Sequence, residues 1–513
     1  MYDLERFEMQ VRGRIPAALE GSLIVSASRR HKDRRRFSRW HDSQADLIRL
    51  DLLPGRPGRI QAHLLTPDPF ATEGVPPQGV DRPREHQADP AHPYDTQPNH
   101  GINIAHGTVW ATNLLFGSPL EVDLESWQPR RILRYCASTD AAPQVSSTSH
   151  FAWSPCGRWG YFHQSLLERE ERGRAVRATD LRLVELDTLT GTERTWGLVP
   201  PPDDPDLHSA NFHSAFCFEE DGRRYVGLLK TGAVLERLAP HAGADEHPVV
   251  PSSPSTIWTV EIDPTRHELT ASLLEGIGEL DGIALSHLHV DASGGEGFTL
   301  FANYKEADVA EETHGANVYG EPPEDVREHY SGMIVEALGC GQVIRYERRR
   351  GATSLKTFRR EYDSSATSQG HTWLPINLAT DRRGRRLFAS FSGFRPRLLP
   401  RHVADAYPER ARKAAQVGYV PPLLLRLDAE TLVPDDRGDR SHLGYAEPMA
   451  FAFVEDPRGG EDVVCTFAPE VGLRIFPADD LTQMVGHGYS PRLITWQDTH
   501  FRTEPAHMAF VHR

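Results

Sequence analysis

The chain has 513 residues, and its 57 Lys and Arg against 72 Asp and Glu give a formal net charge of −15 at pH 7. Hydrophobic residues make up 39 % and charged residues 25 %, which is typical of a folded globular protein. The acidic balance argues against nucleic acid as a partner, because phosphate contacts need clustered positive charge. No apolar run approaches the roughly 20 residues that span a bilayer, and the first residues lack signal-peptide character, so we expect no integral membrane segment and a cytoplasmic location.

Short strands followed by polar turns recur along the chain. Five segments combine a turn with a short aromatic or β-branched run and predict the second strand of a hairpin: 156–162, 221–228, 295–301, 384–389 and 463–467. Four other runs end in an aspartate, as strands do where they enter a turn: 183–187, 260–263, 424–428 and 475–480.

Many short strands without a βαβ alternation predict an all-β fold, and at this length a seven-bladed β-propeller. The 39 Pro and 41 Gly are spread over the whole chain with no long linker, so we expect a single domain over 1–513. Two segments, 303–341 and 395–416, look like insertions that form a loop and helix cap over one face. A short helix is expected within the second, over 403–415.

Familiar catalytic motifs are missing from the sequence. There is no G-x-S-x-G elbow, no phosphate-binding P-loop, no dinucleotide fingerprint and no H-E-x-x-H pair. The five Cys are an odd number without a closely spaced pair, so neither a thiolate zinc site nor a disulfide framework is indicated. The 25 His are the stronger chemical signal.

Four histidines lie in strand-like, apolar surroundings: His150, His213, His287 and His507. Taken alone, each is more often a hydrogen-bonded core residue than a ligand. The inner strands of a propeller converge on its axis, however, and can bring such distant residues to one metal ion. His289 is an alternative to His287, because residues two apart on a strand point to the same face.

The order and local surroundings of these histidines resemble the carotenoid cleavage oxygenase family. Four features carry the resemblance: the turn 154–157 after His150, the stretch 214–216 after His213, the turn 294–297 after His287, and the position of His507 close to the C-terminus. The segments 13–21 and 446–451 are also similar to the family pattern. The resemblance implies a β-propeller with four His ligands to non-haem Fe(2+), and it implies that Glu447 supports one of those ligands.

The resemblance also implies a reaction: cleavage of a carbon–carbon double bond by O2 into two carbonyl products. The partners would be O2 and a small, apolar, conjugated substrate, such as an apocarotenoid or a stilbene-like phenylpropanoid. Four aromatic side chains are candidates for lining the substrate tunnel, although such residues more often belong to the core: Phe116, Phe151, Trp153 and Tyr304.

The sequence departs from the family pattern at three places. Segments 114–117 and 373–377 lack the acid found there in the family, and Met508 replaces the glycine that follows the last ligand. These departures leave open an iron-dependent isomerase or an oxygenase acting on a smaller natural product. A non-enzymatic propeller that serves as an interaction platform is a further alternative.

Overall fold

The computed structural model describes residues 2–31, 44–56, 58–67, 100–112, 118–133, 145–169, 176–208, 210–231, 255–274, 283–292, 297–306, 341–349, 352–360, 374–381, 383–392, 423–433, 450–468, 472–492 and 501–513. The chain divides into two compact units. The first unit comprises Met1–Asp81, Asp325–Val343 and Thr357–Arg513, and the second comprises Arg82–Glu324 and Ile344–Lys356. The single domain expected over 1–513 stays a prediction.

The first unit is built on a 9-stranded sheet with the order β25-β26-β27-β28-β1-β4-β3-β2-β29, and on the sheet β22-β23-β24. The 3-10 helix η1 (Ala17–Leu19) precedes β2. The strands are β1 (Tyr2–Gly13), β2 (Gly21–His31), β3 (Gln44–Leu53), β4 (Arg59–Pro67), β22 (Leu374–Thr380), β23 (Arg386–Ser392), β24 (Leu423–Asp428), β25 (Phe451–Val454), β26 (Val463–Ala468), β27 (Gly472–Pro477), β28 (Gly486–Tyr489) and β29 (Phe501–His512).

The second unit contains the sheet β5-β6-β7-β8 and a larger sheet that runs from β9 to β17, with β18-β19-β20-β21 as a further sheet whose last two strands cross the division between the units. The strands are β5 (Ile102–Ala105), β6 (Thr108–Ala111), β7 (Leu120–Asp123), β8 (Gln128–Ile132), β9 (Val145–Ser147), β10 (Ala152–Trp153), β11 (Trp159–Arg169), β12 (Val176–Asp187), β13 (Glu193–Val199), β14 (Phe212–Glu220), β15 (Arg223–Lys230), β16 (Thr256–Glu261), β17 (Glu268–Leu273), β18 (Ile283–Asp291), β19 (Phe298–Glu306), β20 (Gly341–Arg349) and β21 (Ala352–Arg360).

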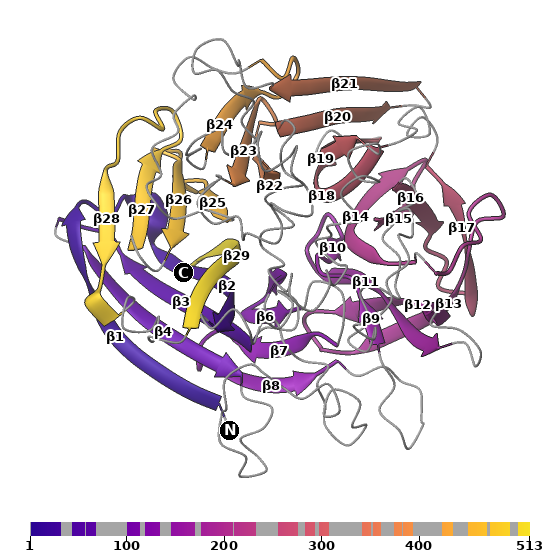
Figure 1. The fold of residues 1–513 in the computed structure, drawn as a ribbon, viewed down its shortest axis with the longest axis horizontal. Helices are drawn as coiled ribbons and strands as arrows, with labels where there is room; N and C mark the ends of the chain where they lie inside the picture. Colours follow the sequence, from indigo (N-terminus) through magenta and orange to yellow (C-terminus); the bar gives the residue numbers. More distant parts are fainter. Residues whose placement is uncertain are drawn as a thin grey trace, which may run out of the picture. The chain divides into compact units, whose positions relative to one another are not determined.

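The described strands lie in five sheets. Within these sheets, seven runs of strands that are close in the chain are hydrogen-bonded to one another: β29 with β2–β4, β5–β8, β9–β13, β14–β17, β18–β21, β22–β24 and β25–β28. Strand β1 links two of the runs by pairing with β4 and β28, and the parallel pairing of β13 with β17 links two others. The C-terminal β29 pairs antiparallel with β2, from His31↔Phe501 to Gly21↔His512 (Figure 1). Closing the last group with strands from both ends of the chain is typical of a β-propeller. The prediction of an all-β propeller fold is confirmed.

The turns that join these strands have the chemistry that the sequence indicates. Asp221 and Gly222 take positive φ values of 51° and 72° between β14 and β15, as a tight hairpin turn requires. At the ends of β12 and β24, the carboxylates of Asp187 and Asp428 accept hydrogen bonds from backbone N–H groups two or three residues later, at 3.0 Å from Leu189 and 2.7 Å from Thr431. These aspartates therefore fix the turn backbone rather than bind a ligand.

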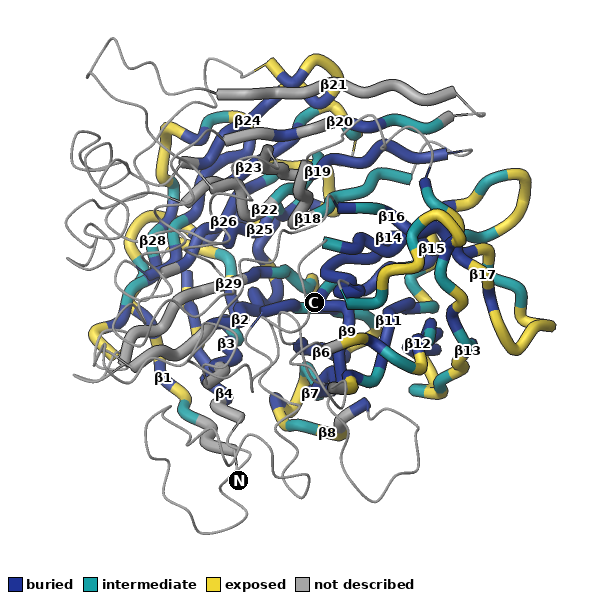
Figure 2. Tube along the Cα trace, turned by 45° about the vertical axis from the view of Figure 1, so that its right-hand side comes forward, coloured by how far each residue is buried: buried dark blue, intermediate teal, exposed yellow. Residues whose placement is uncertain are grey.

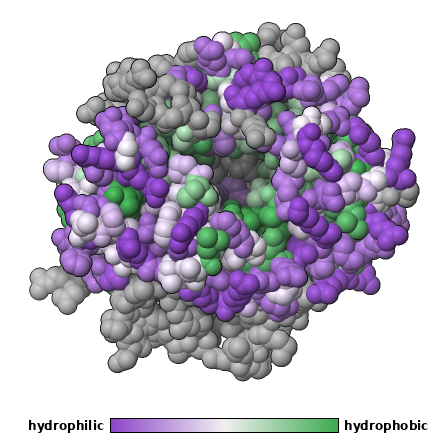
Figure 3. Space-filling model, turned by 180° about the vertical axis from the view of Figure 1, so that it is seen from behind, coloured by the Kyte–Doolittle hydropathy of each residue, from purple (hydrophilic) through white to green (hydrophobic). Residues whose placement is uncertain are grey.

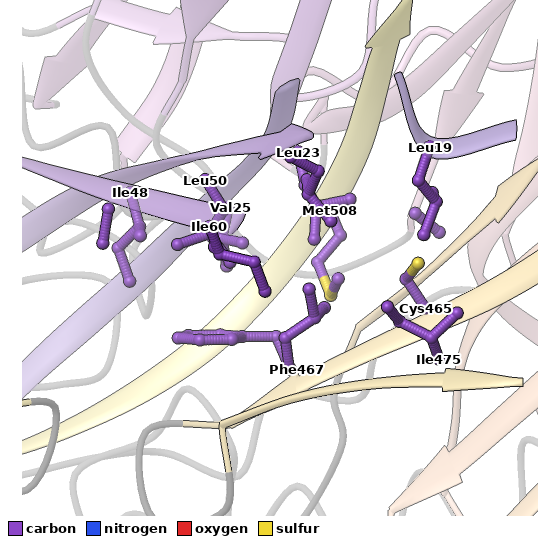
Figure 4. Packing of buried hydrophobic residues seen from close by; sticks show 14 of the residues in the cluster. Leu19, Leu23, Val25, Ile48, Leu50, Ile60, Cys465, Phe467, Ile475 and Met508 are labelled. Carbon is purple, nitrogen blue, oxygen red and sulfur yellow. The ribbon is translucent and has the colours of Figure 1, made fainter. Parts of the chain in front are cut away.

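A large hydrophobic cluster holds the first unit together. Strands β2, β3 and β4 contribute Leu23, Leu50 and Ile60, all fully buried, and they pack with Cys465 and Ile475 of β26 and β27 (Figure 4). In the second unit, the first seven residues of β14 are all buried, so both faces of this strand are covered, whereas the turn between β16 and β17 is largely exposed (Figure 2). A strand buried on both faces is a rigid support for functional side chains.

Hydrophilic side chains dominate the face of the molecule shown in Figure 3. Among the described residues, no helix has the length and apolar character needed to cross a membrane. The two insertions expected to form a cap, 303–341 and 395–416, lie outside the described residues except where β19 ends and β20 begins.

Candidate metal centre

Three histidine rings meet within the second unit. His100 precedes β5, His150 follows β9, and His213 lies in β14. The ring centres are 5.4 Å apart for His100 and His150, 5.1 Å for His100 and His213, and 5.1 Å for His150 and His213. His100 and His213 are buried, and His150 is partly buried. Two of the four histidines predicted as ligands are thus neighbours, and a third ring that the sequence analysis did not select lies beside them.

A β-bulge positions His213. In the pairing of β14 with β15, Phe212 lies opposite Lys230 and Ser214 lies opposite Leu229, so His213 is the extra residue. A bulge interrupts the alternation of side chains and re-aims the residue that it contains. The carbonyl oxygen of His213 accepts hydrogen bonds from the N–H groups of Ser149 at 3.1 Å and His150 at 3.2 Å. The backbone carrying His150 is therefore fastened directly to the bulge.

His100 is held by a second set of backbone contacts. Its N–H donates to the carbonyl oxygen of Thr112 at 3.0 Å, and Gly101 and Thr112 exchange two further hydrogen bonds at 3.2 and 3.0 Å. Gly101 lies so close to the next strand that a Cβ atom there would be 2.1 Å from the carbonyl oxygen of Ser149. Only glycine allows this approach, which brings His100 next to the residue that precedes His150.

The buried amide of Asn103 connects these two segments. Its Nδ2 donates to the carbonyl oxygens of Ser149 at 3.0 Å and Trp110 at 3.2 Å, and its Oδ1 accepts from the N–H of Phe151 at 2.7 Å. The hydroxyl of Thr112 also donates to the Ser149 carbonyl, at 2.7 Å. The backbone is thus fixed on both sides of His150, which limits the movement of that ring.

The surroundings keep the His150 ring neutral. Burial lowers the pKa of His150 well below its usual value, and the neighbouring His213 lowers it further. A neutral imidazole has a nitrogen lone pair available, which is the form that binds metal ions. At pH 7 the His150 ring is therefore ready to act as a ligand.

The spacing of the three rings fits a metal ion. One nitrogen from each ring can be chosen so that all three lie within 4.8 Å of one another. Imidazole nitrogens bind first-row metals at roughly 2.0–2.1 Å, so rings around one ion have centres about 4.6–5.3 Å apart at bond angles of about 90–109°. The observed separations of 5.1–5.4 Å lie at the upper end of this range or just above it. Such a donor set suits iron, zinc, copper or nickel.

The backbone of His287 also lies at a bulge. In the pairing of β18 with β19, the register shifts between Leu285 and Leu288, so the alternation from which we expected His287 and His289 to share a face is interrupted there. The His287 side chain lies outside the described residues. Burial lowers the pKa of His289 to about 4, and its ring stacks on Phe301 at 6.4 Å. The choice between the two histidines stays a prediction.

His507 lies in β29 of the first unit and is buried. It pairs with Ser26 of β2, and the register shifts immediately next to this pair, between Ser26 and Ala27. The N–H of His507 donates to the hydroxyl of Ser26 at 3.3 Å. A third predicted ligand is therefore located next to a bulge, and its role as a ligand stays a prediction.

The remaining predicted site residues are tested less directly. Glu447 and Phe116 lie outside the described residues, as does the side chain of Tyr304. Phe151 stacks on Phe162 with ring centres 4.4 Å apart, in a hydrophobic cluster against which Trp153 packs. The contacts of Phe151 and Trp153 are those of core residues, and their lining of a substrate tunnel stays a prediction.

The sequence analysis missed His100. It stands before a glycine and at the start of the short alternation Ile102-Asn103-Ile104, which is a weak signal. Only the contacts of Gly101 and Asn103 with the chain around Ser149 show why the His100 ring lies at the site.

These features define an all-β, carotenoid cleavage oxygenase-like fold with a buried histidine cluster. The solved structures to which the chain is similar include a tryptophan-to-alanine variant of the Synechocystis apocarotenoid oxygenase, with 12 % sequence identity, a TM-score of 0.59, and coverage of 100 % of this chain and 96 % of that one. An ACO/RPE65 chimera matches with 13 % identity, a TM-score of 0.60 and the same coverage. No protein-family model and no curated protein sequence matches the chain.

Proposed function

We propose that the protein is a non-haem Fe(II)-dependent oxygenase that cleaves a carbon–carbon double bond of an apolar conjugated substrate. The observation that carries the proposal is the buried cluster of imidazole rings on a fold shared with an apocarotenoid oxygenase. The substrate class is an apocarotenoid or a stilbene-like compound. In the reaction, the double bond and the O–O bond break and two C=O bonds form, so both oxygen atoms enter the products and no external reductant is consumed.

The ligands of the proposal are His150 and His213 from the cluster, with His287 and His507 from the sequence pattern and Glu447 as a hydrogen-bond acceptor for one of them. When bound, ferrous iron supplies the position at which O2 is activated. The protein holds neutral imidazoles in a buried setting, which leaves the ion its full positive charge. Fixed backbone around His150 keeps that ring in place.

Metal analysis and turnover together test this proposal. The purified protein should contain close to one iron per chain, and His213→Ala should lose both the iron and the activity. His267→Ala is the matched control, because His267 is an exposed turn residue. Oxygen uptake is measured with an apocarotenal and with a hydroxylated stilbene, and the products are identified by mass spectrometry after reaction under ¹⁸O2.

The outcomes separate the alternatives. Uptake of one O2 per substrate with one ¹⁸O in each carbonyl product supports the dioxygenase. Bond rearrangement without oxygen uptake identifies an isomerase. A protein that does not bind iron under any loading condition contradicts the proposal and supports an interaction platform.

A further inference from the structure

His100 has no place in the four-histidine pattern, yet its ring is as close to the predicted ligands as they are to each other. Its centre lies 5.4 Å from that of His150 and 5.1 Å from that of His213, compared with 5.1 Å between those two. The planes of the three rings are inclined to one another by 53° to 77°. Inclined planes are compatible with three imidazoles that surround a common centre, and they exclude a simple parallel stack of the three rings.

The position of His100 is fixed by close contacts of the residues around it. Gly101 brings the backbone to a distance at which no other residue fits, and Asn103 and Thr112 both donate to the carbonyl oxygen of Ser149. These contacts bring the segment before β5 against the segment that carries His150. The His100 ring is only 3 % exposed, so its approach to the cluster is part of the packed interior.

We propose that His100 is a direct ligand of the same metal ion as His150 and His213. The inference rests on the proposed function to the extent that it requires the site to hold a metal. Four imidazoles would leave a six-coordinate ion two open positions, and a fifth imidazole from His100 would leave one. That one position would suffice for a small molecule such as O2, and the apolar substrate would then be held by protein side chains.

Cobalt(II) is a suitable probe, because its visible absorption depends on the number and type of its ligands and the measurement does not require turnover. The test compares His100→Gly with the wild-type protein and with the His267→Ala control. Metal affinity is measured by titration with Co(II). The His100→Gly variant should bind Co(II) at least about tenfold more weakly, with a changed spectrum. Free imidazole at millimolar concentration should restore the wild-type spectrum, because it fills the space left by the removed side chain.

A second variant guards against misfolding. His100→Gln keeps most of the side-chain volume and should retain the wild-type thermal midpoint while losing Co(II) affinity. If both His100 variants bind Co(II) with wild-type affinity and spectrum while His213→Ala does not, His100 is not a ligand and the proposed function stands. If the wild-type protein binds neither Fe(II) nor Co(II), the proposed function itself fails.

Discussion

Asn103 and Thr112 donate to the same carbonyl oxygen, that of Ser149, and this sharing makes a quantitative prediction. In Thr112→Val one of the two donors is lost, which costs about 1 kcal/mol of unfolding free energy. Asn103→Ala also removes the acceptor of the buried Phe151 N–H, at 2.7 Å, and the donor to Trp110. Since an orphaned buried donor costs about 1–3 kcal/mol and each of the two other bonds about 1 kcal/mol, the total is about 3–5 kcal/mol.

The double variant should be less stable than the two single losses predict. With both donors removed, the Ser149 carbonyl loses each of these side-chain contacts, and residues that share a partner typically show coupling energies of about 0.5–3 kcal/mol. At about 2 cal/mol/K of unfolding entropy per residue, a chain of 513 residues loses about 1 °C in thermal midpoint per kcal/mol. We expect losses in thermal midpoint of about 1 °C for Thr112→Val, about 3–5 °C for Asn103→Ala, and more than the sum of these two losses for the double variant.

Differential scanning calorimetry measures these midpoints. The control combines Asn103→Ala with Ile48→Val, a core change in the first unit that shares no partner with Asn103, and this pair should be additive. Strict additivity of Asn103→Ala and Thr112→Val would refute the shared acceptor and the fixed backbone around His150.

Three further predictions follow from the described contacts. Gly101→Ala should lower the thermal midpoint by several degrees, because the new Cβ would collide with backbone. Gly107→Asn is the control and should leave the midpoint nearly unchanged, since Asn tolerates positive φ and no atom lies within 4 Å of a Cβ there. Lys230→Met should cost about 3–5 kcal/mol, because it leaves the carboxylate of Asp204 without the cation 2.5 Å away. Stability should fall between pH 6.5 and about 3 through His163, whose pKa burial lowers from 6.5 to about 3.

The sign of the pH effect follows from linkage. Below pH 6.5 the unfolded chain binds a proton at this histidine that the folded chain does not, so acid favours unfolding, and at pH 5 the cost is about 2 kcal/mol. Between pH 7 and pH 5, the thermal midpoint of His163→Leu should therefore fall by about 2 °C less than that of the wild type. The midpoint of His267→Ala should fall as much as that of the wild type. Equal slopes of thermal midpoint against pH for all three proteins would exclude His163 as the source of the pH effect.

For Lys230→Met, the added change Asp204→Asn should recover part of the lost unfolding free energy. No recovery would contradict the ion-pair explanation.

Much of the fold was predictable because short-range chemistry determines it. The Asp221-Gly222 turn requires positive φ values, and the aspartates at the ends of β12 and β24 hold turn N–H groups whatever lies beyond them. Such signals are local, so the sequence indicates hairpin strands, their approximate limits and an all-β architecture.

The site was only half predictable for the same reason. Composition and local pattern identified His150 and His213, but β-bulges set the direction of a strand histidine, and a bulge depends on the register between two strands. The backbones of His287 and His507 also lie at or next to register shifts, where counting alternate residues gives no direction.

The sequence by itself determined the strands, their turns and the presence of histidines with unusual apolar neighbours, because each depends on residues a few positions apart. Only the tertiary structure decided that His100 joins His150 and His213. That meeting depends on a glycine lying against the Ser149 carbonyl and on an asparagine bonded across 46 positions of chain, and contacts over such separations leave no periodic trace in the sequence.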